Sequence, residues 1–242
     1  IGFIFENQMR IALVGYGKMG QTIERLALER GHQIVAKIDV DSPRELNDAE
    51  VAIEFTRPDV VLDHLKWLSE AGVPTVVGTT GWSEHKPMVD DWFLQQNGAL
   101  FSSSNFSIGV NLFWEASAFL SKLMDQHPQY RASLHEIHHT QKLDAPSGTA
   151  ITTAEVVLQH SSLEKWIHGT SQEVNTLPVT HDRIDHVPGT HTLSFTSGVD
   201  EIRMTHEAFS RDGFANGAID AAEWLLGKKG IFGMKDLLGL GA

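Results

Sequence analysis

Apolar residues in the first hundred positions alternate between short continuous runs and helical spacing. Residues 11–14 form an almost unbroken apolar run, which is typical of a strand buried on both faces of a parallel sheet. The same pattern predicts further strands at residues 32–39, 51–55, 74–77 and 99–102, with helices after residue 20 and at residues 57–71 and 83–96. Strands that alternate with helices in this way predict parallel βαβ units.

The pattern changes after Asn105. The predicted elements are then a helix at residues 111–126, a strand at 130–139, a hairpin at 190–196 and 201–206 with its turn at 197–200, and helices at 215–226 and 234–240. We therefore predict an α/β protein with a Rossmann-type, doubly wound parallel sheet and a second α+β domain with a mixed sheet. The predicted domains are residues 9–106 with 214–242, which bind a dinucleotide, and residues 107–213, which bind substrate and form oligomer contacts.

Composition excludes several classes of protein. The chain has 41% hydrophobic and 21% charged residues, which excludes intrinsic disorder, and it has no run of about 18 apolar residues that could span a bilayer. A net charge of −12 argues against binding to nucleic acid or to an anionic membrane. The absence of cysteine excludes disulfides and cysteine-ligated metals, and it fits a cytoplasmic location. Residues 1–8 precede Met9 and are interpreted as either a vector remnant or a short extension, without the features of a signal peptide.

A glycine-rich turn follows the first predicted strand. Gly15, Tyr16, Gly17, Lys18, Met19 and Gly20 spell G-x-G-x-x-G and open a helix. In a dinucleotide site the glycines permit a tight turn, a close approach of backbone N–H groups to the pyrophosphate, and close packing of the helix on the strand. Asp39, at the end of the second strand, is placed to bind the adenine ribose hydroxyls. Asp39 favours NAD, whereas Lys37 on the same side could offset its charge, so the sequence leaves NADH and NADPH open.

The segment from Tyr130 to Thr149 holds most of the candidate chemistry. Residues 135–139 spell H-E-x-x-H, the helical motif of zinc peptidases. The alternation of apolar and polar residues before it predicts a strand instead, and His135 and His139 would then lie about 13 Å apart. Zinc–nitrogen bonds of about 2.0–2.1 Å cannot bridge that distance, so we predict no metal site.

The same segment suits proton donation and anion binding. His138 and His139 are side chains that can donate a proton near neutral pH, and Lys142 offers a positive charge to a carboxylate. The helix that begins near Gly148 and Thr149 would present backbone N–H groups to a second anion. These residues lie within twelve positions, which favours a substrate site over unrelated surface residues.

These motifs together resemble those of the dihydrodipicolinate (4-hydroxy-tetrahydrodipicolinate) reductase family. The segment from Glu136 to Ala150 (EIHHTQKLDAPSGTA) carries the family signature. Collinear matches are the glycine turn, EFTRP at 54–58, VGTTG at 77–81, SNFS at 104–107, GTH at 189–191 and FANGA at 214–218. The resemblance implies a Rossmann domain with a mixed-sheet substrate domain, usually as a homotetramer. It also implies an NADH- or NADPH-dependent reductase of lysine and diaminopimelate biosynthesis that acts on a CH or CH2 group of a cyclic dicarboxylate.

The resemblance also assigns roles to residues. It implies that His138 is the proton donor, kept charged by the substrate carboxylates, that His139 contacts the substrate and that Lys142 binds or helps to protonate it. Gly148 and Thr149 would hold a substrate carboxylate. The remaining cofactor-binding residues by this comparison are Phe55, Thr56, Gly78, Thr79, Thr80, Ser103, Ser104, Asn105 and Phe106.

Two departures from the family pattern concern the cofactor side. Tyr16 stands where many members have an extra glycine, and Glu54 replaces a more usual aspartate. Two alternative functions are another two-domain NAD(P)-dependent dehydrogenase of amino-acid metabolism and a non-catalytic dinucleotide sensor. The first leaves the anion site around Lys142 unexplained, and the second needs neither His138 nor Lys142.

Overall fold

The computed structural model describes residues 8–240, so the interpretation of residues 1–8 falls, apart from Gln8, outside the described residues. The chain divides into two compact units. The first contains the described residues up to Ile108 together with those from Asp212 onward, and the second is Gly109–Arg211. The first unit is therefore formed by two segments of the chain, one before and one after the second unit.

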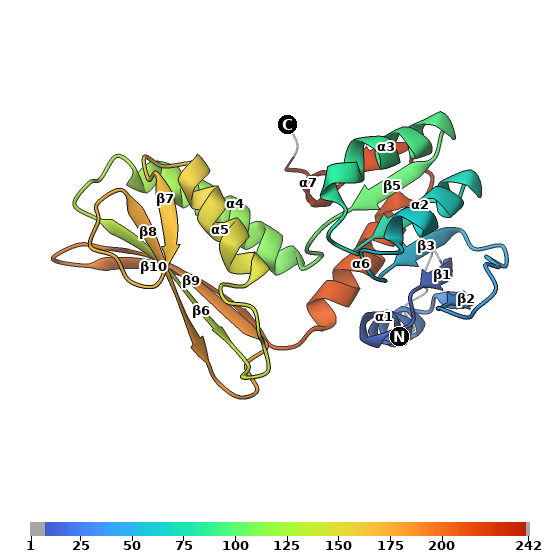
Figure 1. The fold of residues 1–242 in the computed structure, drawn as a ribbon, viewed down its shortest axis with the longest axis horizontal. Coiled ribbons are helices and arrows are strands. Elements are labelled where there is room, and N and C mark those ends of the chain that lie inside the picture. The colour runs from blue at the N-terminus through green and yellow to red at the C-terminus, as the bar shows by residue number, and fades with distance from the viewer. Residues whose placement is uncertain (1–7, 241–242) are drawn as a thin grey trace, which may run out of the picture. The chain divides into compact units, whose positions relative to one another are not determined.

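The first unit is built on a six-stranded parallel sheet with the order β11-β5-β4-β3-β1-β2 (Figure 1). Its strands are β1 (Arg10–Val14), β2 (Gln33–Ile38), β3 (Val51–Glu54), β4 (Thr75–Val77), β5 (Ala99–Ser102) and β11 (Gly230–Phe232). Its helices are α1 (Lys18–Glu29), α2 (Val61–Glu70), α3 (Lys86–Gln95), α6 (Asp212–Leu225) and α7 (Met234–Leu237), with a 3-10 turn at Ser83–His85. Helices α1 and α6 bury apolar side chains against one face, and α2 and α3 against the other. The predicted doubly wound sheet is confirmed.

Helix α6 comes from the far end of the sequence and packs beside α1. Arg30 at the end of α1 bonds to Asp220 at 2.6 Å, and Arg25 bonds to Asp212 at 2.7 Å. A Cβ on Gly217 would lie 1.8 Å from the carbonyl oxygen of Phe106, so this position has no room for a side chain. The last helices of the chain thus complete the core of the first unit.

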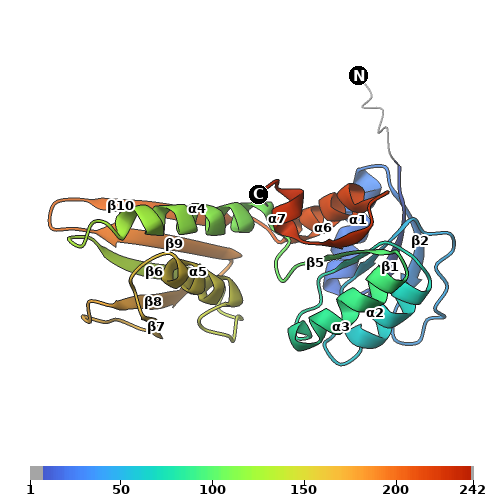
Figure 2. The same cartoon turned by 90° about the horizontal axis from the view of Figure 1, so that it is seen from above.

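The second unit is a mixed five-stranded sheet with the order β10-β9-β6-β8-β7. Its strands are β6 (Arg131–His138), β7 (Lys165–His168), β8 (Thr176–Arg183), β9 (Gly189–Thr196) and β10 (Glu201–Ala208). Helices α4 (Ile108–Met124) and α5 (Gly148–Gln159) lie along the same face of this sheet (Figure 2). They enclose a core that includes Leu134, Val179 and Leu193. The predicted second domain with a mixed sheet is confirmed, as is the hairpin of β9 and β10.

Several predicted boundaries were wrong. The helix predicted at residues 57–71 begins only at Val61, because Pro58 disfavours helical geometry at the preceding residue. The helix predicted at 83–96 is a 3-10 turn followed by α3, and the one predicted at 234–240 ends at Leu237. Strands β7, β8 and β11 were missed. Strands β7 and β11 are only four and three residues long, and β8 is interrupted by polar residues.

Candidate active site

The glycine-rich turn joins β1 to α1 at the carboxyl edge of the parallel sheet. The chain passes from β1 to β2 on one side of β1 and then to β3 on its other side, so the strand order reverses at β1. Open α/β sheets bind ligands in the crevice at such a point. A cavity of about 350 Å³ lies here, and it is lined by residues that follow β1, β2 and β3, among them Gly15, Gly17, Asp39 and Thr56.

The three glycines of the turn fit the three roles expected in a dinucleotide site. Gly15 has a φ of +93°, and a Cβ there would lie 2.0 Å from the carbonyl oxygen of Phe55. A Cβ on Gly20 would lie 2.3 Å from the carbonyl oxygen of Gly15, so the helix packs tightly on the turn. A Cβ on Gly17 would meet no atom within 4 Å. Gly17 is also the N-cap of α1 and provides no side-chain hydrogen bond, which leaves room for a phosphate at the helix N-terminus.

Lys37 on β2 and Asp39, directly after this strand, have different surroundings. Asp39 lines the cavity, whereas Lys37 does not. The Lys37 ammonium lies 2.5 Å from a Glu24 carboxylate oxygen and 3.2 Å from the Tyr16 hydroxyl, and it stands 4.7 Å from the centre of the Tyr16 ring. Lys37 is therefore held against α1. A second cation, Arg44, lines the cavity and is paired with Asp63.

The remaining predicted cofactor residues follow β3, β4 and β5 along the same edge of the sheet. The Thr79 hydroxyl accepts a hydrogen bond from the backbone N–H of Thr56 at 2.7 Å, which ties two of these loops together. A Cβ on Gly78 would lie 2.1 Å from the Phe55 ring, so the ring fills that space. Further along, the Ser103 hydroxyl donates to the carbonyl oxygen of Asn105 at 2.7 Å. The structure thus gathers the predicted cofactor residues at one edge of the sheet in the first unit.

The proposed proton donor lies on β6 in the second unit. The predicted strand is confirmed: His138 is 6% exposed on the face that carries the helices, whereas His135 lies on the opposite face and bonds to Thr180 at 2.8 Å. A Cβ on Gly189 would stand 3.0 Å from Nε2 of His138, so the ring packs closely over the neighbouring strand at a glycine. His138 is therefore buried in a restricted position.

A buried carboxylate lies beside His138, and sequence reasoning did not find it. Glu136 is fully buried, and its Oε2 lies 3.5 Å from Nδ1 of His138 and 3.6 Å from Nε2 of His191. The rings of His138 and His191 are 5.1 Å apart at 71°. Glu136 and His191 pair in register across β6 and β9, a contact that their separation in sequence conceals.

The loop after β6 carries the predicted anion-binding lysine. Lys142 bonds to both carboxylate oxygens of Asp144, at 2.9 and 2.8 Å, so the positive charge is already paired. This pair is partly exposed, and such pairs contribute only about 0–1 kcal/mol, so a substrate carboxylate can replace Asp144 at little cost. The guanidinium of Arg183 on β8 donates to the carbonyl oxygens of Lys142 and Asp144 and holds the loop against the sheet.

The loop ends at the N-terminus of α5. Ser147 is the N-cap: its hydroxyl accepts from Ala150 N–H at 3.1 Å, and its own N–H donates to both oxygens of Glu136 at 3.1 and 3.2 Å. Gly148 begins the helix, is exposed, and has nothing within 4 Å of its Cβ position. The predicted anion site at Gly148 and Thr149 thus coincides with the N-terminus of α5, where the helix dipole favours an anion.

His139 lines a cavity whose lining does not include His138. That cavity is about 310 Å³ and is lined by His139, Gln141, Asp185 and Arg211, among others. The Arg211 guanidinium lies 3.2 Å from Nε2 of His139. Arg211 adds a cation that the sequence had not indicated, because it lies 72 residues from His139.

Glu136, His138 and His191 also have ligand atoms within 4.8 Å of one another, so their geometry alone would admit a metal ion. Both carboxylate oxygens of Glu136 already accept the N–H of Ser147, and the cationic Arg183 lies 3.6 Å from Oε1. A second cation at this point would face that positive charge. This charge argues against a metal ion at the cluster.

Burial dominates the protonation of the cluster. Burial lowers the pKa of His138 to about 4, against the opposing charge of Glu136, so the imidazole by itself is neutral at pH 7. Burial alone would raise the pKa of Glu136, but hydrogen bonds from His191 and Ser147 lower it to about 2. Burial also lowers the pKa of His206 on β10, the strand next to β9. The expectation of a charged His138 thus requires a bound dianion to raise its pKa.

These shifts predict an acid-sensitive second unit. Folding lowers the pKa of His138 from about 6.5 to about 4, so the unfolded chain binds a proton more readily than the folded protein does. The contribution of His138 to the free energy of unfolding is therefore fully present above about pH 6.5 and is lost as the pH falls towards 4. We expect the free energy of unfolding to be lower at pH 5 than at pH 7, with His138 accounting for about 1–2 kcal/mol. Urea denaturation at both pH values measures this. The difference in unfolding free energy between pH 5 and pH 7 should shrink in His138→Gln and persist in His135→Gln. An equal difference in the unmodified protein and in both variants would show that His138 is not its source.

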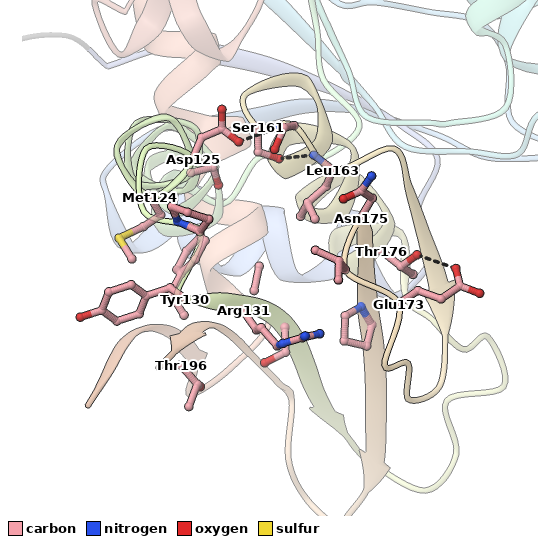
Figure 3. A pocket seen from close by; sticks show the side chains of 18 of the residues that line it. Met124, Asp125, Tyr130, Arg131, Ser161, Leu163, Glu173, Asn175, Thr176 and Thr196 are labelled. Atoms are coloured by element: carbon pink, nitrogen blue, oxygen red, sulfur yellow. Dashed lines mark hydrogen bonds between the residues drawn. The ribbon is translucent and has the colours of Figure 1, made fainter. Parts of the chain in front are cut away.

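A second cavity in the same unit lies at the start of β6 (Figure 3). His138 is at the other end of this strand, about 23 Å away at roughly 3.3 Å per residue. The cavity is about 310 Å³, and Met124, Tyr130, Arg131 and Asn175 are among its lining residues. Among the residues that the structure describes, its lining includes none of the predicted site residues. Its polar groups bond to one another, as Thr176 does to Glu173 at 3.0 Å. The site chemistry is therefore concentrated at the other end of β6.

The two groups of residues define a class of protein. A doubly wound sheet with a turn that fits a phosphate, in one chain with a second unit that carries a buried histidine and a predicted anion-binding loop, is typical of a two-domain NAD(P)-dependent oxidoreductase. No helix among the described residues is long and apolar enough to cross a membrane.

Comparison with known sequences identifies the family. Residues 9–106 match the family model for the N-terminus of dihydrodipicolinate reductase, and residues 109–238 match that for its C-terminus. The chain is 44% identical over 234 residues to the 4-hydroxy-tetrahydrodipicolinate reductase of Christiangramia forsetii, covering 95% of this chain and 98% of the relative. It is 31% identical over 245 residues to the reductase of the same name from Methanoregula boonei, covering 93% and 95%. The chain therefore belongs to the dihydrodipicolinate reductase family.

A solved structure supports the same fold. The dipicolinate-bound dihydrodipicolinate reductase from Paenisporosarcina sp. TG-14 has a TM-score of 0.76 and 21% sequence identity, covering 95% of this chain and 99% of that one. The resemblance predicted from the sequence is confirmed at the level of family, fold and enzyme class.

Proposed function

We propose that this chain reduces the unsaturated cyclic dicarboxylate of the lysine and diaminopimelate pathway, that the first unit binds the nicotinamide cofactor, and that the second unit binds the substrate. Membership of the family is the observation that supports this reaction. The contacts among His138, Glu136 and the N-terminus of α5 support the roles proposed for the residues of the second unit. When bound, the cofactor supplies a hydride to an electron-poor carbon of the substrate.

The protein residues then have three tasks. The N-terminus of α5 and Lys142 bind the two substrate carboxylates and orient the ring. The two negative charges raise the pKa of His138, which takes up a proton as the substrate binds. Hydride addition places negative charge on the conjugated carbon–nitrogen system, and the imidazolium of His138 transfers its proton there. One carbon–carbon double bond is thereby saturated by one hydride and one proton.

A coupled assay tests this function. A synthase that produces the dicarboxylate precursor is combined with the chain and with NADH or NADPH, and oxidation of the cofactor is followed by absorbance. We expect oxidation that depends on both the synthase and the chain. A folded sample that binds NADH but shows no turnover with either cofactor would favour the dinucleotide-sensing alternative.

We propose that the enzyme uses either nicotinamide cofactor and prefers NADH. Asp39 lines the cavity at the end of β2, where a carboxylate binds ribose hydroxyls and repels a 2′-phosphate. Lys37 is held by Glu24 and Tyr16, so it does not offset that charge. Arg44 lines the same cavity and is the cation through which NADPH would retain some binding.

A substitution of Asp39 should change this preference. We expect kcat/KM for NADH to fall about tenfold in Asp39→Ala, because a charged hydrogen bond to the ribose contributes about 1.5–3 kcal/mol. The value for NADPH should fall less or rise. Steady-state kinetics with both cofactors measure the ratio. Asp41→Ala is the matched control, because Asp41 is exposed two residues further on and does not line the cavity. A fall of equal size for both cofactors would contradict the role of Asp39.

A homotetramer and a cytoplasmic location complete the proposal. Helices α4 and α5 pack on one face of the second sheet, and the opposite face carries polar and charged side chains, among them Arg203 and Thr192, which bonds to Thr205 at 3.1 Å. A face of this kind suits contact with another copy of the sheet. Sedimentation equilibrium at several concentrations measures the mass of the assembly directly.

A further inference from the structure

We propose that Glu136 is a positioning residue that serves both halves of the substrate site, holding the imidazole of His138 with one oxygen and the N-terminus of α5 with both. This inference rests on the proposed function, because it takes His138 as the proton donor and α5 as a carboxylate-binding helix. What it adds is the residue that fixes these two groups relative to each other.

The contacts of Glu136 connect three segments of the chain. Its side chain is fully buried on β6, two residues before His138 and on the same face of the sheet. Both carboxylate oxygens accept the N–H of Ser147, the N-cap of α5, at 3.1 and 3.2 Å. Oε2 also lies 3.5 Å from Nδ1 of His138. Any shift of this carboxylate therefore moves the proton donor and the helix N-terminus together.

The remaining contacts fix the carboxylate itself. Arg183 on β8 lies 3.6 Å from Oε1, and His191 on β9 lies 3.6 Å from Oε2. The Ser147 hydroxyl lies 3.2 Å from Nε2 of His191, which closes a ring of contacts among β6, β9 and α5. Burying a charged carboxylate is unfavourable in free energy unless the group is paired and hydrogen-bonded, and these contacts offset that penalty.

The orientation of His138 decides which of its nitrogens exchanges a proton. Among the described residues, Nδ1 of His138 has no hydrogen-bond partner within normal distance, and Oε2 of Glu136 lies 3.5 Å from it. A carboxylate at this position stabilises the form with hydrogen on Nδ1 and leaves Nε2 to exchange with substrate. The same negative charge stabilises the imidazolium, so Glu136 also keeps the donor protonated up to a higher pH.

Other charged groups around His138 act in the opposite direction. The positive charges of Lys142 on the loop and Arg183 on β8 disfavour the imidazolium, as does His191 on β9. Asp144 is paired with Lys142, and His206 on β10 lies beside His191, with ring centres 6.5 Å apart. Among the charged groups of the described residues that pack around the ring, Glu136 alone both contacts it and favours its protonated form.

The test is the pH profile of kcat in variants of this network. A general acid must be protonated, so the rate falls above the pKa of His138 in the substrate complex. Glu136→Gln keeps an acceptor for Ser147 and removes the charge. We expect kcat to fall about tenfold and the alkaline limb to move to lower pH by about one unit. Glu136→Asp restores the charge and should move the limb back towards its original position.

Two further measurements keep the outcome clear. His191→Gln should move the alkaline limb to higher pH or leave it in place, and this variant serves if Glu136→Gln fails to fold. Glu136→Ala removes the acceptor of Ser147 N–H as well, and it should weaken binding of dipicolinate about tenfold more than Glu136→Gln does. An alkaline limb that stays in place in Glu136→Gln, or one that moves to lower pH in His191→Gln, would overturn the proposal.

The result is separable from the proposed function. Loss of activity in His138→Gln together with an unmoved limb in Glu136→Gln would reject the role of Glu136 and retain the proton donor. Full activity in His138→Gln would reject the donor itself, whatever the Glu136 variants show.

Discussion

Replacing His138 by glutamine is expected to lower kcat by about 100- to 10 000-fold, the range that general acid catalysis contributes. Glutamine fills a similar space and keeps a polar group near Glu136, but it cannot donate a proton as an imidazolium does. KM for the dicarboxylate should change little, because the carboxylates are bound by Lys142 and the N-terminus of α5. Steady-state kinetics in the coupled assay separate the two parameters.

The control for this variant lies on the same strand. His135→Gln makes the same chemical change three residues earlier, on the opposite face of β6, where His135 bonds to Thr180. We expect kcat within about twofold of the unmodified enzyme, since surface substitutions change energies by about 0.5 kcal/mol or less. If KM alone rose in His138→Gln, His138 would be a binding residue and another group would supply the proton.

Replacing Gly17 by alanine is expected to weaken NADH binding about 100-fold, which corresponds to the loss of one or two hydrogen bonds to a charged phosphate. The added methyl group would occupy the space within 4 Å that is open at this position, where backbone N–H groups approach the pyrophosphate. Gly17 has a φ of −75°, which alanine adopts without strain. Binding should therefore be lost while the fold is kept, and fluorescence titration with NADH measures the change.

Gly198→Ala is the matched control, because Gly198 lies in the β9–β10 hairpin turn and its Cβ position also meets nothing within 4 Å. Thermal unfolding of both variants should match that of the unmodified protein or shift slightly upward, as a glycine-to-alanine change at a permissive position does. Unchanged NADH affinity in Gly17→Ala would place the pyrophosphate elsewhere.

The parts of the site that sequence predicted are those encoded locally. The glycine turn lies between one strand and one helix, and His138, Lys142 and Gly148 lie within eleven consecutive residues, so their spacing alone indicated a site. The alternation around His138 also predicted a strand in place of a helix, which the structure confirms.

The parts that sequence missed depend on pairing between distant strands. Glu136 meets His191 because β6 and β9 are antiparallel neighbours, and His138 pairs with Arg183 because β6 and β8 are parallel neighbours. Neither register can be obtained from periodicity within one strand. The charge state of His138 was likewise hidden, because burial lowers its pKa and burial depends on α5 and on the neighbouring strands.

The return of the chain to the first unit through α6 and β11 has a consequence for the order in which the protein can fold during translation. The ribosome completes β1 to β5 well before it makes α6, so the face of the sheet that α6 covers stays open to water until the second unit has been synthesised. A fragment ending at Ile108 would lack Ala218, Ile219 and Leu225 from its core and should expose an apolar surface. The second unit is in this sense an insertion, and a short linker joining residue 108 to residue 212 is the way to obtain the first unit alone.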